Sequence, residues 1–375
     1  MDRWLKHSPG RWKNACGWLW FHEPMTAVDA RRRRLLKASS AALIAAPFLR
    51  PTAGFAQQGG YSLSDDPTLA TLVQTSAGGP APASPDTLTV RWLGCANHEL
   101  AFGDKVVLLD AWYDRGPHNR PLGFGPQDVT RADLIINGHA HFDHIADIAA
   151  VARQTGAQVM GAPLSTEYLR SQGLPDSQLL PTAGGEHFDF DGFTVDAILA
   201  HHSELPTDVL SKLGDALAAD APPLSPAEQQ QAAEVRARGL TDPRIITEGT
   251  IAYLFTFAGS NGFRLLYRNS AGPITDAERA TMAQLDGTDL AIIAYQGHVV
   301  ADSQIAVTLP LVELYKPGIY LPTHHDTAAG FFIDQATEPL FMAIRDSLPS
   351  VRSVSPLYRT PVAVSMERKQ LLLGA

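Results

Sequence analysis

From residue 87 onward, short hydrophobic runs alternate with segments of helical periodicity. Residues 158–160 and 193–199 are short runs rich in apolar and β-branched residues, which predicts strands. Residues 145–152 and 165–169 are expected to be helical. This alternation predicts an α/β (α+β) domain that covers residues 87–375.

Two segments depart from the alternation. Residues 57–86 are rich in Gly, Pro, Ser and Ala, which predicts a linker or an arm over the domain. Residues 205–245 are rich in Ala, Pro, Gln and charge and are interpreted as a helical insertion. Ser225 and Pro226 have the residue types of an N-cap and a first helical position. The insertion is either a lid or substrate-selecting helix pair, or a solvated helical excursion or dimer contact.

Residues 1–56 are typical of an N-terminal extension with an export signal. Residues 31–37 (RRRRLLK) fit the twin-arginine pattern, an apolar segment follows at 41–49, and residues 54–56 offer a small-residue cleavage site. We therefore expect export by the twin-arginine translocase into the periplasm. The alternative is a basic cytoplasmic tail followed by a short helix, and Met25 is a candidate for the true start.

Charge narrows the possible partners. Cleavage after Ala56 would leave 319 residues with 20 basic and 36 acidic side chains, a net charge of −16. Such a surface argues against nucleic acid and gives no attraction to anionic lipid. No stretch after residue 57 is long and apolar enough to span a bilayer. Cys95 would be the one remaining cysteine, which excludes an internal disulfide. We expect a small-molecule substrate.

The densest group of candidate metal ligands is the sequence His-Ala-His-Phe-Asp-His that begins at His139. It follows the apolar run 134–136, which predicts a strand that ends in a ligand-rich loop. His139 and His141 are two residues apart, so in an extended segment their side chains point the same way. Asp143 and His144 then face another direction and can serve a second metal. Imidazole and carboxylate suit Zn²⁺, or Fe²⁺ or Mn²⁺ at a mixed site.

Two further pairs of histidines follow apolar runs. His201 and His202 come after residues 193–199, and His324 and His325 come after another such run. Histidines at successive strand ends indicate one rim of a sheet where ligands converge. For any single pair, the alternative is a partly buried, hydrogen-bonded histidine.

Together these segments resemble the metallo-β-lactamase superfamily of metal-dependent hydrolases over roughly residues 88–330. The motif H-x-H-x-D-H is the signature of that superfamily. The other landmarks occur in the expected order, at residues 90–94, 106–110, 200–203, 289–293 and 321–324. The pattern is most similar to the branch that contains L-ascorbate-6-phosphate lactonase and N-acyl-phosphatidylethanolamine phospholipase D. The resemblance implies a four-layer αββα metallo-β-lactamase sandwich, which the alternation of elements fits.

The resemblance also implies two groups of three metal ligands. The first metal would be held by His139, His141 and His202, and the second by Asp143, His144 and His324. His202 is preferred over His201 because this branch places its ligand directly before a Ser. His324 is preferred over His325 because the ligand usually follows Pro plus one residue.

Two positions depart from the superfamily pattern. A metal-bridging Asp normally occupies a turn after a strand, but here Ser270 stands in that position, after Asn269. A neutral hydroxyl removes one negative charge, so the second metal should bind more weakly, or the site should hold one metal. Arg268 is a candidate to fill the space or charge left by the missing Asp. Cys95 stands where relatives of this branch often carry His, and a small buried thiol is favoured over a catalytic role.

The ligand set implies hydrolysis. A metal with an open position lowers the pKa of bound water from 15.7 to about 7, which supplies hydroxide at neutral pH. The hydroxide attacks a carbonyl or phosphoryl centre while the metal stabilises the oxyanion. Asp143 would orient the hydroxide and accept its proton. We expect one or two Zn²⁺ per chain, with Mn²⁺ or Fe²⁺ as alternatives, and an ester, lactone or phosphodiester substrate. The lack of an evident basic cluster favours a lactone or carboxylic ester.

Two other classes of function are weighed against this one. The first is a non-catalytic periplasmic binding or scaffold protein on the same fold, since Ser270 replaces the Asp; the six other ligands argue against it. The second is a di-iron redox centre, which generally uses a full carboxylate set. Asp110 is expected to be a buried hydrogen-bonding residue near the site. His298 either reaches the substrate or has a structural role. The histidines expected in loops or on the surface are His98, His118 and His187.

Overall fold

The protein is described by a computed structural model at residues 73–117, 119–204, 211–212, 223–296, 301–328, 331–332 and 336–372. The predicted export signal, His118 and His298 lie outside these residues. All described residues belong to one unit, Tyr61–Ala375.

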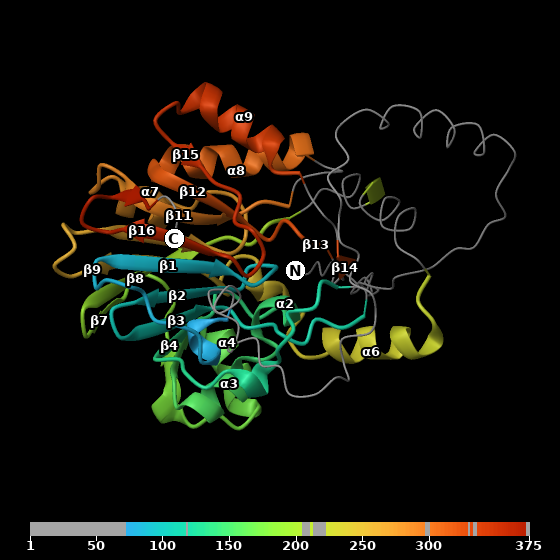
Figure 1. Ribbon diagram of the computed structural model, residues 1–375. Coiled ribbons are helices and arrows are strands. Elements are labelled where there is room, and N and C mark those ends of the chain that lie inside the picture. The colour runs from blue at the N-terminus through green and yellow to red at the C-terminus, as the bar shows by residue number, and fades with distance from the viewer. Residues whose placement is uncertain are drawn as a thin grey trace, which may run out of the picture. The chain divides into compact units, whose positions relative to one another are not determined.

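Most strands belong to two large mixed sheets (Figure 1). In spatial order the first sheet consists of β17 (Gln370–Leu371), β16 (Pro361–Ser365), β1 (Thr87–Trp92), β2 (His98–Phe102), β3 (Lys105–Leu109), β4 (Leu134–Ile136), β5 (Gln158–Gly161) and β6 (Leu179–Pro181). The second consists of β15 (Arg352–Ser353), β12 (Pro317–Thr323), β11 (Thr288–Ala294), β10 (Arg264–Arg268), β9 (Thr250–Phe257), β8 (Phe193–Ala200) and β7 (His187–Phe190). A separate hairpin pairs β13 (Thr327–Ala328) with β14 (Phe331–Phe332).

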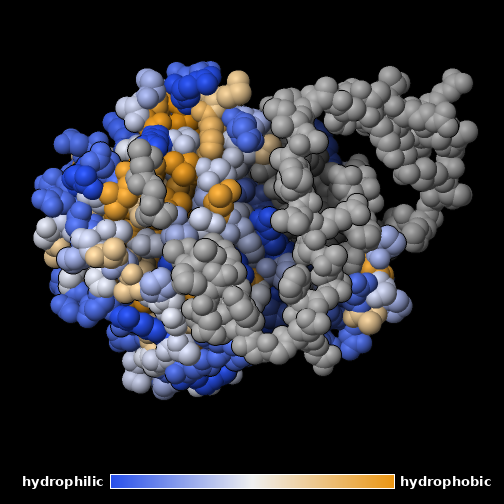
Figure 2. All heavy atoms as spheres, in the orientation of Figure 1, coloured by the Kyte–Doolittle hydropathy of each residue, from blue (hydrophilic) through white to orange (hydrophobic). Residues whose placement is uncertain are grey.

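Helices cover the outer faces of both sheets, with α3 and α4 at the bottom of Figure 1 and α7, α8 and α9 at the top. The α-helices are α2 (Phe142–Ile145), α3 (Ile148–Thr155), α4 (Pro163–Ser171), α6 (Pro226–Arg236), α7 (Asp276–Met282), α8 (Ala301–Tyr315) and α9 (Glu338–Ser347). Short 3₁₀ turns are η3 (Thr75–Ala77), η4 (Pro126–Asp128), η5 (Asp176–Gln178) and η6 (Pro243–Ile245). Figure 2 shows hydrophilic side chains around the rim of the visible face and hydrophobic ones over the region labelled α8 and β12 in Figure 1.

Three hydrophobic clusters separate the layers. Leu134 and Ile136 of β4 pack with Leu321 of β12 in the cluster between the sheets. Their neighbours Ile135 and Tyr320 point the opposite way, into the clusters beneath the outer helices. Strands buried on both faces need apolar residues at every position, which is why they are continuous apolar runs in the sequence. The predicted four-layer αββα sandwich is confirmed.

The strands that precede the predicted ligands run in matching directions. In the first sheet β3 is parallel to β4, and β1 has the same direction because it is antiparallel to β2, which is antiparallel to β3. In the second sheet β10, β11 and β12 are parallel, and β8 shares their direction through antiparallel β9. Residues that follow these strands are therefore delivered to one edge of each sheet.

Most of the predicted local elements are observed. Residues 158–160 and 193–199 are strands, and 165–169 lie within α4. The helix predicted over 145–152 is instead divided between α2 and α3. The break occurs because the main-chain N–H of Asp147 donates to the Ala111 carbonyl, outside the helical ladder. None of the described helices is long and apolar enough to cross a membrane.

Part of the segment predicted to be a linker or an arm packs on the domain. The main-chain N–H groups of Thr75 and Ser76 donate to the Glu99 carboxylate at 3.0 and 2.8 Å. Arg91 pairs with the same carboxylate at 2.7 Å. The negative charge of Glu99 is therefore balanced, although Glu99 is fully buried. These residues therefore form an arm that is fastened to β2.

Candidate metal centre

The first group of predicted ligands comes together at the ends of β4 and β8. His139 and His141 lie in the loop after β4, and His202 lies two residues beyond β8. Their ligand nitrogens all lie within 4.8 Å of one another. His139 Nε2 is 3.0 Å from His141 Nδ1. His201, which the sequence left as the alternative, is not a member of this group.

Hydrogen bonds set the ring nitrogens that face the centre. His139 Nδ1 lies 3.1 Å from Asn269 Oδ1, which can only accept, so this nitrogen carries the proton. His202 Nδ1 likewise donates to the Ser203 carbonyl at 2.7 Å. In a neutral imidazole the opposite nitrogen, Nε2, then carries a lone pair. Two lone pairs are thus held ready for a cation, as is usual for metal-binding histidines.

The second group lies next to the first and consists of Cys95, Asp143, His144 and His324. Asp143 Oδ2 is 3.3 Å from His324 Nε2, and Asp143 Oδ1 is 3.7 Å from His144 Nε2. The sequence predicted three of these four residues as ligands and treated Cys95 as a structural thiol. His325, the alternative to His324, is stacked on Trp92 with ring centroids 4.2 Å apart.

Asp110 and Asn269 support both groups from behind. Asp110 Oδ2 accepts hydrogen bonds from His144 Nδ1 at 2.7 Å, Tyr267 Oη at 2.5 Å and Asn269 Nδ2 at 2.8 Å. The expectation that Asp110 is a buried hydrogen-bonding residue is confirmed. Asn269 joins the groups, because its oxygen holds His139 and its nitrogen binds the carboxylate that holds His144. Gly138 permits this approach, since a Cβ there would overlap the Asn269 side chain.

The distances in the second group fit a metal ion. Bonds of about 2.0–2.3 Å at tetrahedral angles place the ligand atoms of zinc roughly 3.3–3.7 Å apart. Asp143 Oδ2 lies 3.3 Å from His324 Nε2 and 3.8 Å from Cys95 Sγ. The donor set of the two groups, imidazole with carboxylate and thiol, is also that of zinc sites.

Burial keeps the first group neutral. It lowers the pKa of His141 to about 4 and that of His202 to about 3, and it lowers the pKa of His139 well below its usual value. Imidazole must be neutral to bind a metal, so these residues are in the ligating state at pH 7. In the second group burial opposes ionisation of Asp143, but His144 and His324 lower its pKa. Burial acts to lower the pKa of His144, but Asp143 and Asp110 raise it by more, so the net shift is upward.

The turn after β10 supplies no carboxylate to either group. Ser270 Oγ accepts a hydrogen bond from the Ser203 main chain at 2.9 Å, beside His202. The hypothesis that Arg268 fills the place of the missing Asp is wrong. Its buried guanidinium pairs with Glu278 at 2.6 Å and donates to the carbonyls of Ser270, Gly272 and Pro273, because the strand alternation turns it toward α7.

The predicted insertion contributes a packed wall at this edge. Helix α6 begins as expected, with Ser225 as N-cap in a capping box with Glu228. Val235 of α6 is buried in a cluster with Cys95 and Trp112. Arg238 then pairs with Asp147 at 2.9 Å. Residues 205–210 and 213–222 of the insertion lie outside the described residues, so the predicted helix pair is not tested.

Two histidines expected in loops or on the surface have different environments. His98 lies in β2 and is 1% exposed, so the expectation is wrong: β2 is covered on both faces. Burial lowers its pKa to about 4. His187 lies on β7 with its side chain 53% exposed, in agreement with a surface position.

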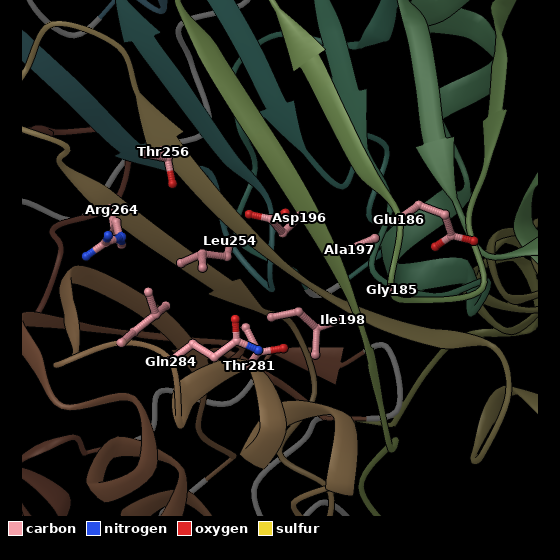
Figure 3. A pocket seen from close by; sticks show the side chains of 11 residues that line it. Gly185, Glu186, Asp196, Ala197, Ile198, Leu254, Thr256, Arg264, Thr281 and Gln284 are labelled. Carbon is pink, nitrogen blue, oxygen red and sulfur yellow. The ribbon is translucent and has the colours of Figure 1, made fainter.

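A pocket away from the ligands is shown in Figure 3. It has a volume of about 340 Å³ and lies between β8, β9 and α7, with Asp196, Leu254, Arg264 and Gln284 among its lining residues. None of its lining residues belongs to the two ligand groups. The chemistry of the ligand groups therefore does not take place in this pocket.

Comparison with known proteins supports the same fold. A family model described as a beta-lactamase superfamily domain matches residues 105–218. The structure is similar to that of Igni18, described as a novel metallo hydrolase from Ignicoccus hospitalis, with a TM-score of 0.51 and 15% identity over 74% of this chain and 98% of that one. The chain has the metallo-β-lactamase fold. The histidine-rich loop after β4 lies within the segment matched by the family model, residues 105–218.

Sequence relatives of this metallo-β-lactamase-fold chain include proteins named UPF0173 metal-dependent hydrolase. One from Roseiflexus sp. is 35% identical over 121 residues, which are 32% of this chain and 50% of the relative. The chain thus matches only about half of that relative's length. Another, from Cupriavidus necator, is 26% identical over 66% of this chain and 78% of the relative.

Proposed function

We propose that this protein is a metal-dependent hydrolase with two adjacent metal sites. The observation that carries the proposal is the juxtaposition of the two ligand groups: the rings of His139 and His144 have centroids 4.0 Å apart. The names of the relatives and the metallo-β-lactamase fold support the same class of activity. Zn²⁺ is the proposed metal, because imidazole, carboxylate and thiol are all good zinc ligands.

The metal would activate water for attack on an electrophilic carbon and stabilise the negative charge that develops on the substrate oxygen. The protein residues have separate parts in this reaction. Asp110 and Asn269 fix the orientation of the imidazoles. Asp143, whose pKa is lowered by His144 and His324 against the effect of burial, is ionised and orients water and accepts its proton at a carboxylate oxygen.

We propose a lactone or carboxylic ester as the substrate, rather than a phosphodiester. Three arginines of this region already have carboxylate partners: Arg115 with Asp326 at 3.0 Å, Arg238 with Asp147 at 2.9 Å, and Arg268 with Glu278 at 2.6 Å. An arginine that is held in an ion pair offers less to a phosphoryl group, whereas a neutral ester needs no such partner.

The test is metal content combined with turnover of the full chain. Elemental analysis of the wild type and Ser270→Asp would be compared with hydrolysis of lactone, aryl ester and aryl phosphodiester panels, before and after chelation. We expect two metals per chain, or one that rises to two in Ser270→Asp. We also expect ester or lactone turnover that chelation abolishes and that is lost in Asp143→Asn. Asp189→Asn is the control, because Asp189 is an exposed carboxylate on β7. Absence of metal from both the wild type and Ser270→Asp would overturn the proposal and favour a binding or scaffold protein.

We also propose export to the periplasm by the twin-arginine translocase, based on residues 31–37. Replacement of Arg32 and Arg33 by Lys should retain the protein in the cytoplasm. Cell fractionation measures this, and unchanged periplasmic recovery of the variant would contradict the proposal.

A further inference from the structure

The side chain of Cys95 lies beside the three predicted ligands of the second metal. Its Sγ is 3.8 Å from Asp143 Oδ2, and it belongs to the group whose ligand atoms all lie within 4.8 Å of one another. The side chain is fully buried, so the thiol is not a surface group that happens to approach the site. The other three members are residues that the sequence independently indicated as ligands of the second metal.

The main chain holds this cysteine in an uncommon conformation. Cys95 has a φ of 49°, a value that costs a non-glycine residue on the order of 1 kcal/mol. Its N–H donates to Asp326 Oδ1 at 2.8 Å. Its carbonyl accepts from Trp92 Nε1 and Thr323 Oγ1, both at 2.8 Å. These hydrogen bonds hold Cys95 in this conformation and so fix the position from which its side chain extends.

Charge gives a second reason. Ser270 supplies no carboxylate, and Asn269 beside it is neutral, so the turn after β10 contributes no negative charge. Asp143 alone would leave a divalent cation half neutralised. Without a cation, burial and then Asp143 raise the pKa of the Cys95 thiol well above its usual value. With a cation bound, a thiolate at Cys95 and neutral His144 and His324 would bring the charge of the second group to −2.

We propose that Cys95 binds the second metal through its sulfur, together with Asp143, His144 and His324. This inference rests on the proposed function, because it presumes that the second group holds a metal. As the metal–sulfur bond forms, the thiol proton leaves to solvent and the sulfur lone pair enters the new bond; no redox change is involved.

Two consequences follow from four protein ligands in the second group. A metal bound tetrahedrally by all four of these residues would have no open position, whereas one bound by the three histidines of the first group would keep one open for water. Water would therefore be activated at the first group. The metal of the second group would stabilise the local structure and contribute positive charge. A soft thiolate also selects Zn²⁺ over Mn²⁺ at the second site, since Mn²⁺ prefers oxygen ligands.

Cobalt spectroscopy tests the proposal independently of activity. The full chain in a Cys16→Ser background has Cys95 as its one thiol. Titration of the metal-free protein with Co²⁺ should produce the intense near-ultraviolet sulfur-to-cobalt charge-transfer band along with the weaker visible ligand-field bands. In the same background, Cys95→Ser should lose the charge-transfer band and keep the first cobalt. Its affinity for the second cobalt should fall by more than the roughly 10–100-fold typical of losing a hydrogen-bond partner of a ligand.

The experiment distinguishes failure of sulfur ligation from failure of the proposed hydrolase function. Two bound cobalt ions with no charge-transfer band would overturn sulfur ligation and leave the proposed hydrolase intact. If no cobalt binds, both proposals fail. X-ray absorption of the zinc-loaded protein is a second measurement, in which a sulfur shell at about 2.3 Å is expected for the wild type and not for Cys95→Ser. Cys95→His, which substitutes another zinc ligand, should restore binding of the second metal without that shell.

Discussion

The main-chain nitrogen of His324 donates a hydrogen bond to the carbonyl oxygen of Cys95 over 2.8 Å. Both residues have positive φ, 61° and 49° respectively, and both side chains enter the second ligand group. The bond therefore ties the loop after β1 in one sheet to the end of β12 in the other. The hydrogen bond helps to keep both residues in their strained main-chain conformations. A change in the loop after β1 should therefore alter metal binding by the second group.

Gly94→Ala should disturb this arrangement. Gly94 has a φ of 91°, and a Cβ there would overlap the Arg115 guanidinium and crowd Asp326, which fixes the Cys95 main chain. We expect a loss of about 1–2 kcal/mol from backbone strain alone, more from the overlap, and reduced binding of the second metal. Urea unfolding and metal analysis measure the two effects.

Gly103→Ala is the matched control for backbone strain. Gly103 has a φ of 53°, and a Cβ there has nothing within 4 Å. It should lose stability through strain but keep its full metal content. Equal metal content in the two alanine variants would contradict the role given to the loop.

Asn269→Ala should weaken both metal sites. The substitution removes the acceptor for His139 and a donor to Asp110, which holds His144. Loss of such a partner typically lowers metal affinity by about 10–100-fold. Competition with a chromophoric chelator measures the affinities of the two sites. Ser270→Ala, in the same turn, should change affinity much less, because the Ser270 hydroxyl bonds only to Ser203 among the described residues.

Local patterns predicted the strands that precede the ligands, whereas the four-layer sandwich and the two ligand groups were implied by the superfamily resemblance. The strands are apolar on both faces, and each ligand segment directly follows one, so β4, β8 and β12 could be predicted together with the loops that they deliver. The resemblance also favoured His202 over His201, because a Ser follows it, and His324 over His325, because it follows Pro plus one residue. The structure places His202 and His324 in the two ligand groups.

The supporting residues could not be found in this way. Cys95 and Asp326 are 231 residues apart, and Asn269 reaches His139 from 130 residues away. Contacts of this kind depend on how the two sheets pack against each other, which no short sequence pattern predicts. The position of Cys95 was noted, but the usual burial of free cysteines favoured a structural thiol, since the sequence did not show that its side chain joins the second group.

Glu278→Gln should destabilise the fold without affecting metal binding. Glu278 and Arg268 form an ion pair at 2.6 Å in which both side chains are fully buried, and Tyr315 Oη donates to the same carboxylate at 2.5 Å. Removal of one partner leaves an uncompensated buried charge, which costs about 3–5 kcal/mol. Chemical denaturation measures the loss. Asp276→Asn, an exposed position of the same helix, should change stability much less; similar losses for both would contradict the assignment.

His98 should make stability depend on pH. Burial lowers its pKa from 6.5 to about 4, although the Ala96 carbonyl, 3.0 Å from Nδ1, opposes the shift. Between these values the unfolded chain binds more protons than the folded one, so acid favours unfolding. The contribution of His98 is fully present above pH 6.5 and is lost as the pH falls toward 4, by at most about 1.4 kcal/mol per pH unit.

The measurement is the free energy of unfolding against pH for the wild type and His98→Gln. Both are kept in the same chelating buffer, so that the histidines of the ligand groups contribute equally to each curve. The variant should have a shallower slope between pH 6.5 and 4, whatever its stability at neutral pH. His187→Gln is the control of opposite sign: Asp196 raises the pKa of exposed His187, so its removal should leave the slope unchanged or slightly steeper. Parallel curves for the wild type and His98→Gln would mean that His98 is not held neutral in the folded protein.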